Sequence, residues 1–290
     1  MRSITCINNE TGKSITISED SFAPLFLAGL EGVYSADYDV AVSDNTMSDG
    51  GTYQGSRANT RNIVITAIDQ PNNVYNQPVR DIVYTIFKKG ELGTFIYHED
   101  NVPDRKIDYY TESVKREDGG HRPFTISLIC TEPSFRDLND TNVYMANWVG
   151  QFEFVHEFAE EGEEIGIRMT ERIVNIINNS ATKEIGFTAI IETTATTTNP
   201  VLTRVESQER IALNGLTISA GDQLIITTER NNKHVRLVHE GVTTEVNQYL
   251  TEDSEFFNIL SGENHIVYNA SAGVDNMSVL IRYSFKYDGA

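Results

Sequence analysis

The feature that most constrains this chain is a long series of short segments in which apolar and polar residues alternate. In the second half, nine such segments follow one another at a spacing of about ten residues, with turn-forming residues between them. A period of two is typical of a strand with one buried face, and many such strands predict a β-sandwich. The predicted strands are Ile165–Met169, Ile173–Ile177, Ile185–Glu192, Val201–Glu206, Glu209–Leu213, Gln223–Thr228, His234–Val238, His265–Asn269 and Ser278–Lys286.

The first half of the sequence predicts a second β-rich region with a single helix. Residues Ile4–Ile17 alternate on both sides of a turn-rich stretch, which predicts a β-hairpin at the start of the chain. Within Asn76–Lys89, apolar residues at i, i+3, i+4 and i+7 predict a helix that ends before a glycine. Further strands are predicted at Arg61–Asp69, Gly93–His98 and Arg122–Cys130, and Asp104–Lys115 fits a strand better than the alternative, a helix.

A polar stretch separates the two regions. The strand predicted to end at Cys130 is followed by Glu132-Pro133 and by polar residues up to Asn139. We therefore expect an N-terminal domain over residues 1–139 and a C-terminal domain over residues 140–290. A short apolar turn at Ser254–Leu260 interrupts the later strands, and we expect it to close one end of the sandwich.

The charge balance narrows the possible partners. The 290 residues carry 42 acidic and 23 basic side chains, a formal net charge of −19. That balance argues against a protein that grips a nucleic-acid backbone, since such a grip needs clustered Lys and Arg. Cys6 and Cys130 are the only cysteines, which excludes a disulfide framework and fits a reduced compartment. We also expect no signal peptide and no membrane span, because no apolar run reaches the length that a span needs.

Candidate chemistry is sparse. His156-Glu157 with Glu160 resembles half of a metalloprotease helix, but a glutamate stands where the second histidine is needed. This stretch is rich in glutamate between residues 153 and 164, so a solvated acidic connector explains it better. No serine lies in a Gly-x-Ser-x-Gly turn, and no glycine loop has the signature of a phosphate-binding site. We expect no catalytic residue, no bound metal and no cofactor, and therefore no enzyme.

One polar segment is distinctive. The stretch from Asp49 to Asp69 combines glycines, an aromatic residue and two arginines before it enters a strand. We interpret it as a mobile loop that presents Tyr53 and Arg57 at a surface, with Arg61 at the start of the strand. Tyr and Arg are enriched at the centre of protein interfaces, so the three residues are candidates for a subunit or partner contact. An ordinary long hairpin loop is the alternative.

The order of several stretches resembles the distal tail protein family of long-tailed phages. In the first half the resemblance rests on the early hairpin, on the helix, and on three motifs. In the second half it rests on four further motifs that occur in the family's order. These motifs are Gly51 to Arg57, Gly93-Thr94-Phe95-Ile96-Tyr97, Cys130-Thr131-Glu132-Pro133-Ser134-Phe135, Asn199-Pro200, Ala220-Gly221-Asp222, Phe256-Phe257 and Gly262-Glu263-Asn264. The polar stretch Asp100–Gly120 and the acidic connector depart from the pattern.

The resemblance implies a mainly β protein with a structural role in the virion. An N-terminal β-rich domain with one helix would form a hexameric ring, and a C-terminal galectin-like β-sandwich would project outward. The ring would join the tail tube protein to the tail-tip hub protein and would offer a surface to receptor-binding or baseplate proteins. DNA would pass through the ring only in transit, and acidic walls would repel its backbone. The protein would be assembled in the host cytoplasm and would reside at the tail tip or baseplate, with no membrane contact.

Two other functions remain open at this stage. A galectin-like sandwich can serve as a carbohydrate-binding module for host-surface glycans. That role usually needs an aromatic platform, and Trp148, the only tryptophan, lies before the predicted sandwich strands, while Tyr249, Phe256 and Phe257 fit a core or a plug better. A glycan-cleaving enzyme is the other alternative. Such an enzyme needs two carboxylates at a suitable distance, but among 42 carboxylates such a pair occurs by chance and is only weak evidence for this activity.

Overall fold

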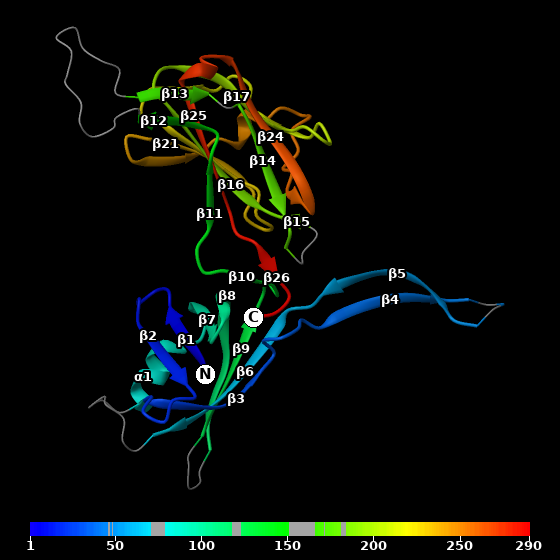
Figure 1. Ribbon diagram of the computed structural model, residues 1–290, viewed down its shortest axis with the longest axis vertical. Helices are drawn as coiled ribbons and strands as arrows, with labels where there is room; N and C mark the ends of the chain where they lie inside the picture. Colours follow the sequence, from blue (N-terminus) through cyan, green and yellow to red (C-terminus); the bar gives the residue numbers. More distant parts are fainter. Residues whose placement is uncertain are drawn as a thin grey trace. The chain divides into compact units, whose positions relative to one another are not determined.

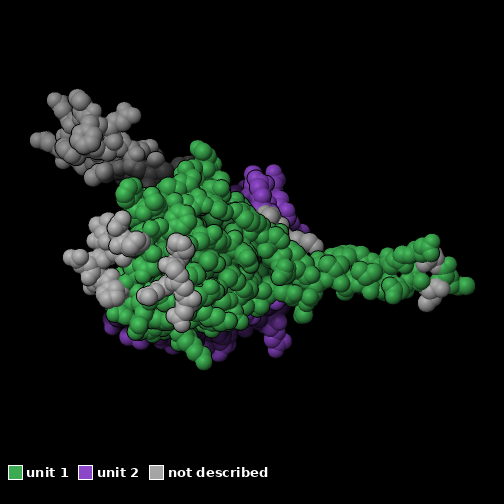
Figure 2. Space-filling view, turned by 90° about the horizontal axis from the view of Figure 1, so that it is seen from below, with its two compact units in different colours: residues 1–138, 286–290 green, residues 139–285 purple. Residues whose placement is uncertain are grey.

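The computed structural model shows a mainly β protein that divides into two compact units (Figure 1). Unit 1 consists of residues 1–138 and 286–290, and unit 2 consists of residues 139–285 (Figure 2). The structure describes residues 1–45, 47, 49–70, 79–117, 123–150, 166–170, 172–180 and 184–290, without the side chains of 146–150 and 166–170. The acidic connector predicted around residues 153–164 lies outside these residues.

Unit 1 is built on one nine-stranded sheet that closes on itself. The strand order is β26-β10-β8-β7-β1-β2-β3-β6-β9, and an additional pairing of β8 with β9 completes the closure. All its neighbouring strands are antiparallel except β2 and β3. The strands are β1 Arg2–Asn8, β2 Ser14–Ser18, β3 Leu25–Glu31, β6 Arg61–Asp69, β7 Leu92–Glu99, β8 Val102–Arg116, β9 Phe124–Cys130, β10 Phe135–Asp137 and β26 Lys286–Tyr287.

The alternation in the sequence places every second side chain of these strands inside the closed sheet. In β6, Ile63, Ile65 and Ala67 are buried, as predicted, and β9 buries its alternate residues in the same way. Cys6 of β1 and Cys130 of β9 are both buried and both free thiols in this core. The early hairpin is confirmed as β1 and β2, and the polar stretch after Asp100 forms the long strand β8.

The helix predicted over residues 76–89 is observed as α1, Val79–Ile86; residues 76–78 lie outside the described part of the chain. Val79, Val83 and Ile86 are buried against the sheet, as the spacing of apolar residues predicts. The chain continues for one more helical hydrogen bond, from the Phe87 amide to the Val83 carbonyl, before Gly90 takes a left-handed φ of 82°. Lys88 and Lys89, at the end of the predicted range, lie just beyond the helix.

The last five residues belong to unit 1, which the sequence-based boundaries of 1–139 and 140–290 do not anticipate. Strand β26 pairs with β10, and the Ala290 amide donates a hydrogen bond to the carbonyl of Val33. The guanidinium of Arg105 packs over the ring of Tyr287, 3.8 Å from its centroid, and also donates to the carbonyl of Gly289. These contacts attach the end of the chain to the first unit, after it has crossed the second.

Unit 2 is a sandwich of two antiparallel sheets. A six-stranded sheet has the order β11-β25-β16-β20-β21-β22, and a five-stranded sheet has the order β14-β24-β17-β18 with β19 paired to β17. Their strands are β11 Thr141–Tyr144, β14 Ile173–Asn178, β16 Phe187–Thr193, β17 Thr197–Arg204, β18 Arg210–Ala212, β19 Thr217–Ile218, β20 Gln223–Thr227, β21 His234–His239, β22 Val242–Glu245, β24 Gly262–Ala272 and β25 Met277–Tyr283. Two short pairs complete the unit, β12 Ala146–Gly150 with β13 Gly166–Thr170 and β15 Glu184–Ile185 with β23 Ile259–Leu260.

The core of unit 2 lies between its two sheets. Ile191 and Leu224 come from the six-stranded sheet, and Leu202 and Tyr268 come from the five-stranded sheet. The apolar turn predicted at Ser254–Leu260 contributes Phe257, whose ring lies 5.4 Å from that of Phe187. All nine strands predicted in this half have a counterpart in the structure, and the expected mainly β fold with one α-helix is confirmed for the described residues.

Candidate functional site

A two-stranded arm on unit 1 is almost fully exposed. It consists of β4, Tyr38–Asp44, and β5, Gly51–Ala58, which pair antiparallel and form a sheet of their own. Every residue of the two strands is exposed except Gly55, which is half-buried. Figures 1 and 2 show the arm extending away from the body of unit 1. The segment expected to be a mobile loop is therefore a regular β-ribbon.

Glycines make this ribbon possible. A side chain at Gly51 would place its Cβ 2.5 Å from Cγ1 of Val42, so only glycine allows this close pairing of the strands. At Gly55 the backbone takes a φ of 152°, and the register shifts between Ala41 and Val42. This shift is a β-bulge, and it places Tyr53 directly opposite Val42. The glycines that favoured a loop in the sequence thus shape the arm.

One face of the arm is apolar. Residues directly opposite each other in an antiparallel pair point to the same side, so Tyr38, Val40, Val42 and Tyr53 share one face. Their exposed fractions are 45%, 57%, 56% and 63%. Four large apolar side chains on one exposed face are typical of a surface that a partner covers. A two-stranded ribbon is also marginally stable alone in water, which adds to the reason for a partner.

The opposite face of the arm is polar. The guanidinium of Arg57 forms an ion pair with Asp39 at 3.0 Å, and the amide of Asn59 donates to the same carboxylate at 2.9 Å. The hydrogen bonds from Asn59 and then from Arg57 hold the pKa of Asp39 below its usual range. This face satisfies its own polar groups, so the unpartnered surface of the arm is the apolar one.

The structure brings Tyr53 and Arg57 onto the same arm but on opposite faces, and it separates Arg61 from both. Arg61 is only 2% exposed. Its guanidinium donates to the carbonyls of Pro133 and Gly32, both at 2.7 Å, and to the carbonyl of Asp288. Arg61 is the first residue of β6, the strand that follows the arm, and its hydrogen bonds to these three backbone carbonyls hold the start of the strand in place. The expectation that its side chain is presented at a surface is corrected.

Three further residues of the arm were not among the interface candidates predicted from the sequence. Tyr38, Val40 and Val42 alternate with Asp39, Ala41 and Ser43, a pattern that is typical of a strand but gives no sign that its apolar face is uncovered. Tyr38 also connects the base of the arm to the end of the chain, since the nearby Asp288 carboxylate raises the pKa of its phenol through a hydrogen bond. The alternation of Tyr38, Val40 and Val42, together with the aromatic Tyr53 in the next segment, is the sequence pattern that could have indicated this face.

A second feature of unit 1 is a hollow of about 520 Å³ between α1 and β2. Its apolar wall comes from both elements and from the segment before β3, and its rim is polar. The apolar lining residues are Ile15, Pro24, Val79, Ile82 and Ile86, and the polar ones are Lys13, Ser14, Thr16, Asp81 and Thr85.

Unit 2 has a shallow groove on the outer face of its six-stranded sheet. Two adjoining hollows of about 300 and 240 Å³ share Glu192, Gln223 and Ser278. At one end, Tyr144 is 59% exposed and lies opposite Leu280 of the neighbouring strand. The amide of Gln223 donates to Glu192 at 2.6 Å, so polar side chains line the groove in a fixed arrangement.

The candidate metal and membrane features give no further site. Among the described residues, no group of three His, Cys, Asp or Glu side chains could hold a metal ion. The segment with His156, Glu157 and Glu160 lies outside those residues. No α-helix within the described ranges is long and apolar enough to cross a membrane. Trp148 lies on β12, and Phe257 is buried in the core as expected.

Comparison with known proteins gives one family match. Residues 180–287 match the family model for the C-terminal domain of siphovirus-type tail components. This range covers most of unit 2, including every strand of the two sheets except β11 and β14. No curated protein sequence matches the chain significantly.

Solved structures extend the likeness to the whole chain. The crystal structure of the Dit protein (gp 19.1) of phage SPP1, described as a hub adsorption apparatus of phages that infect Gram-positive hosts, is 9% identical, with a TM-score of 0.64. That similarity covers 98% of this chain and 99% of the other. A chain of the phage P2 baseplate in its activated conformation with calcium is 12% identical, with a TM-score of 0.57 and full coverage of both chains. A chain of the same baseplate with strontium is 10% identical, with a TM-score of 0.56 and full coverage of both chains.

These similarities agree with the order of motifs in the sequence. The sandwich of unit 2 is recognised by its sequence, and both units together have the fold of the SPP1 protein. The resemblance to the distal tail protein family is thereby confirmed. Residues 180–287 match the C-terminal domain of siphovirus-type tail components, and the chain as a whole has the fold of the SPP1 Dit protein.

Proposed function

We propose that six copies of this chain close into a ring that joins the tail tube protein to the tail-tip hub protein. The observation that carries this proposal is the exposed apolar face of the arm, because a single chain leaves it uncovered. A contact that each copy both offers and receives generates a closed ring when the rotation between copies closes. The fold shared with a hub protein and a baseplate chain supports the same role.

In this role the chain would be non-enzymatic and would reside at the tail tip of the virion after assembly in the host cytoplasm. Its net charge of −19 suits a channel through which DNA passes, since carboxylates repel the phosphate backbone. The outer surface of the ring would hold receptor-binding or baseplate proteins. Tyr53 on the apolar face and Arg57 on the polar face are the residues that we assign to the contact between copies.

The double substitution Tyr53→Ala with Arg57→Ala tests this assignment. Both side chains are exposed, so the thermal transition of the single chain should stay nearly unchanged. We expect sedimentation velocity to show a ring for the wild type and mainly single chains for the double variant at the same concentration. A double variant that assembles as well as the wild type would remove both residues from the interface.

A second function is favoured by the groove on unit 2, which could bind a neutral glycan. The ring of Tyr144 offers an apolar platform, and Glu192 with Gln223 and Arg282 with Asn142 offer planar hydrogen-bonding groups on the same sheet face. The negative net charge disfavours anionic polymers. Glycan-array binding by the wild type that disappears in Tyr144→Ala would support this function. Equal signals from both proteins would contradict it.

A further inference from the structure

Residues 286–290, which we call the strap, meet the arm at its base. The amide of Ala290 donates a hydrogen bond of 2.9 Å to the carbonyl of Val33, in the segment that leads into β4. The phenol of Tyr38, the first residue of β4, donates a hydrogen bond to the carboxylate of Asp288. The strap therefore holds the entrance of the arm at two points.

The strap also reaches the exit of the arm. The backbone carbonyl of Asp288 accepts a hydrogen bond from Arg61, where the chain enters β6 after the arm. The guanidinium of Arg61 donates at the same time to the carbonyl of Gly32, directly after β3, at 2.7 Å. Asp288 thus connects, through its side chain and its backbone, the two segments between which the arm extends.

One glycine shows how closely the strap is packed. A Cβ at Gly289 would lie 2.3 Å from the carbonyl oxygen of Tyr34, so only glycine fits here unless the backbone moves. The guanidinium of Arg105 donates to the carbonyl of Gly289 and packs over the ring of Tyr287. The strap is therefore attached to β8 through Arg105 and lies against the backbone that leads into the arm.

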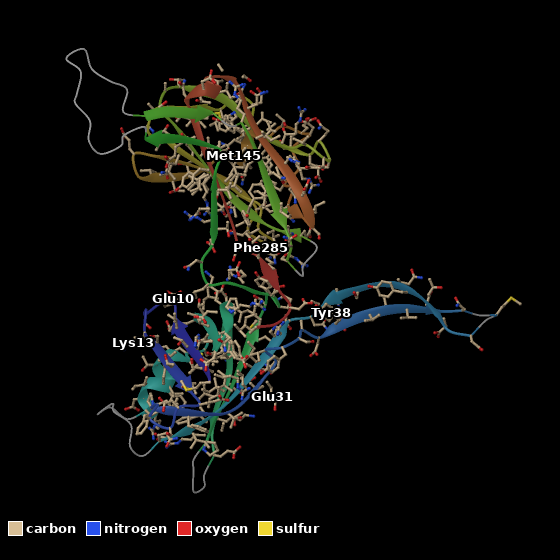
Figure 3. The ribbon with its side chains drawn as sticks, viewed as in Figure 1. Glu10, Lys13, Glu31, Tyr38, Met145 and Phe285 are labelled. Carbon is tan, nitrogen blue, oxygen red and sulfur yellow. The ribbon has the colours of Figure 1, made fainter. Side chains whose placement is uncertain are left out.

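The sheets of the described chain do not fix the direction of the arm. Among the described strands, β4 and β5 hydrogen-bond only with each other and not with the nine-stranded sheet. The amide of Asn59 donates to the carbonyl of Asp37 at 2.8 Å, which closes the base of the ribbon but connects the ribbon only to itself. In Figure 3, Tyr38 lies where the arm leaves the body of unit 1. The direction of the arm therefore depends on the contacts made at this point.

We propose that the strap, through Asp288, is the positioning element that sets the direction of the arm in the single chain. Strands β26 and β10 lie outside the closed part of the sheet, since the pairing of β8 with β9 completes the closure. The strap can therefore act on the base of the arm without taking part in that closure. An arm held in one direction loses less conformational freedom when a partner covers it. This inference concerns the single chain and does not depend on the proposed ring.

Two substitutions remove the contact between strap and arm, one from each side. Tyr38→Phe deletes the phenol hydroxyl and Asp288→Ala deletes the carboxylate; both side chains are exposed, so the melting temperature should stay nearly unchanged. Asp288→Asn keeps an oxygen that accepts the hydrogen bond and should behave as the wild type does. Tyr53→Phe is the matched control, since it deletes a phenol hydroxyl that bonds to Ser56 farther along the same arm.

Hydrogen exchange of the Asn59 amide measures the opening of the base of the arm. The loss of one partly exposed hydrogen bond should make this amide exchange about fivefold faster in Tyr38→Phe and in Asp288→Ala. The double variant should exchange no faster than either single variant, because both substitutions remove the same bond. The amides of β6 should exchange at the wild-type rate in every variant, since the rest of unit 1 is unaltered.

Electron–electron distance measurements report the direction of the arm itself. Spin labels at Ser43→Cys on the arm and at Lys13→Cys, on the opposite side of unit 1 in Figure 3, define one distance. Cys6 and Cys130 are fully buried and do not compete for the label. The distance distribution should be narrow for the labelled wild type and broader when Asp288→Ala is added.

Both measurements use single chains at low concentration, which separates this inference from the proposed function. An unchanged Asn59 exchange rate and an unchanged distance distribution in Asp288→Ala would overturn the role of the strap. An equal acceleration in Tyr53→Phe would do the same, because any loss of a phenol hydroxyl would then loosen the arm. If the strap variants loosen the arm but the wild type never forms a ring, this inference stands and the proposed ring fails.

Discussion

The buried guanidinium of Arg61 gives the sharpest test of how unit 1 is held together, through the substitution Arg61→Ala. The side chain donates hydrogen bonds to the carbonyls of Pro133, Gly32 and Asp288, which come from three separate segments. It also lies over the ring of Phe135, 5.0 Å from the centroid. Its removal leaves three part-buried carbonyls without this donor and opens a gap above an aromatic ring.

The expected loss of stability follows from these contacts. A hydrogen bond to a charged group contributes about 1.5–3 kcal/mol, so three of them would suggest about 4.5–9 kcal/mol. The substitution also removes the unfavourable burial of the guanidinium, which offsets part of that sum, and we expect about 3–5 kcal/mol. At roughly 3 °C per kcal/mol for a unit of about 140 residues, the melting temperature of unit 1 should fall by about 10 °C. The melting temperature of Arg61→Lys should lie between those of the wild type and Arg61→Ala, since an ammonium cannot reproduce the hydrogen-bonding geometry of the guanidinium.

Urea and thermal unfolding followed by circular dichroism, with hydrogen exchange to assign the transition to unit 1, measure this loss. The matched control is Arg57→Ala, whose side chain is 81% exposed on the arm and whose effect should stay within about 0.5 kcal/mol. If Arg61→Ala lowered the stability as little as Arg57→Ala does, the stabilising role of the Arg61 hydrogen bonds would be refuted. Loss of assembly in Arg61→Ala with unchanged stability would return Arg61 to the interface.

Three further predictions rest on other contacts. Asp222 raises the pKa of His239 through a hydrogen bond at 2.7 Å, so this contribution to stability is present below the unfolded pKa of about 6.5 and is lost as the pH rises through the folded pKa. The melting-temperature difference between the wild type and His239→Gln should therefore be largest below about pH 6.5 and disappear as the pH rises through the raised folded pKa; a difference independent of pH would contradict it. Gly93→Ala should cost about 1–3 kcal/mol in urea unfolding, because the new Cβ would lie 2.4 Å from the Tyr109 ring; an unchanged midpoint would contradict the packing. Deletion of residues 286–290 should destabilise unit 1 more than Arg61→Ala does, as it removes β26 as well as a partner of that arginine; a smaller loss of melting temperature would contradict the role of this strand.

Regular periodicity made most of the fold predictable from the sequence. Arg61–Asp69 alternates cleanly and is the strand β6 with the expected buried face. The single helix was predicted from its apolar spacing, and the strand interpretation of Asp104–Lys115 was correct within β8. In these segments the local pattern and the tertiary environment favour the same structure, so the pattern alone was sufficient.

The second strand of the arm was misread because its glycines have low strand propensity and because burial is not visible in a sequence. Gly51 and Gly55 favour a loop on propensity, but here they permit close pairing and a bulge. Arg61 was expected at a surface, where most arginines lie. Its burial depends on carbonyls up to 227 positions away, which no local pattern records. The return of the chain to unit 1 is likewise hidden, since β26 spans only two residues.

The solution mass and symmetry of the wild-type protein test the central claim most directly. Light scattering over a range of concentrations, with negative-stain images of the largest species, measures both. We predict a species of six times the chain mass that appears as a ring with a central hole. A single chain at every concentration, or a closed two-fold dimer, would contradict the ring.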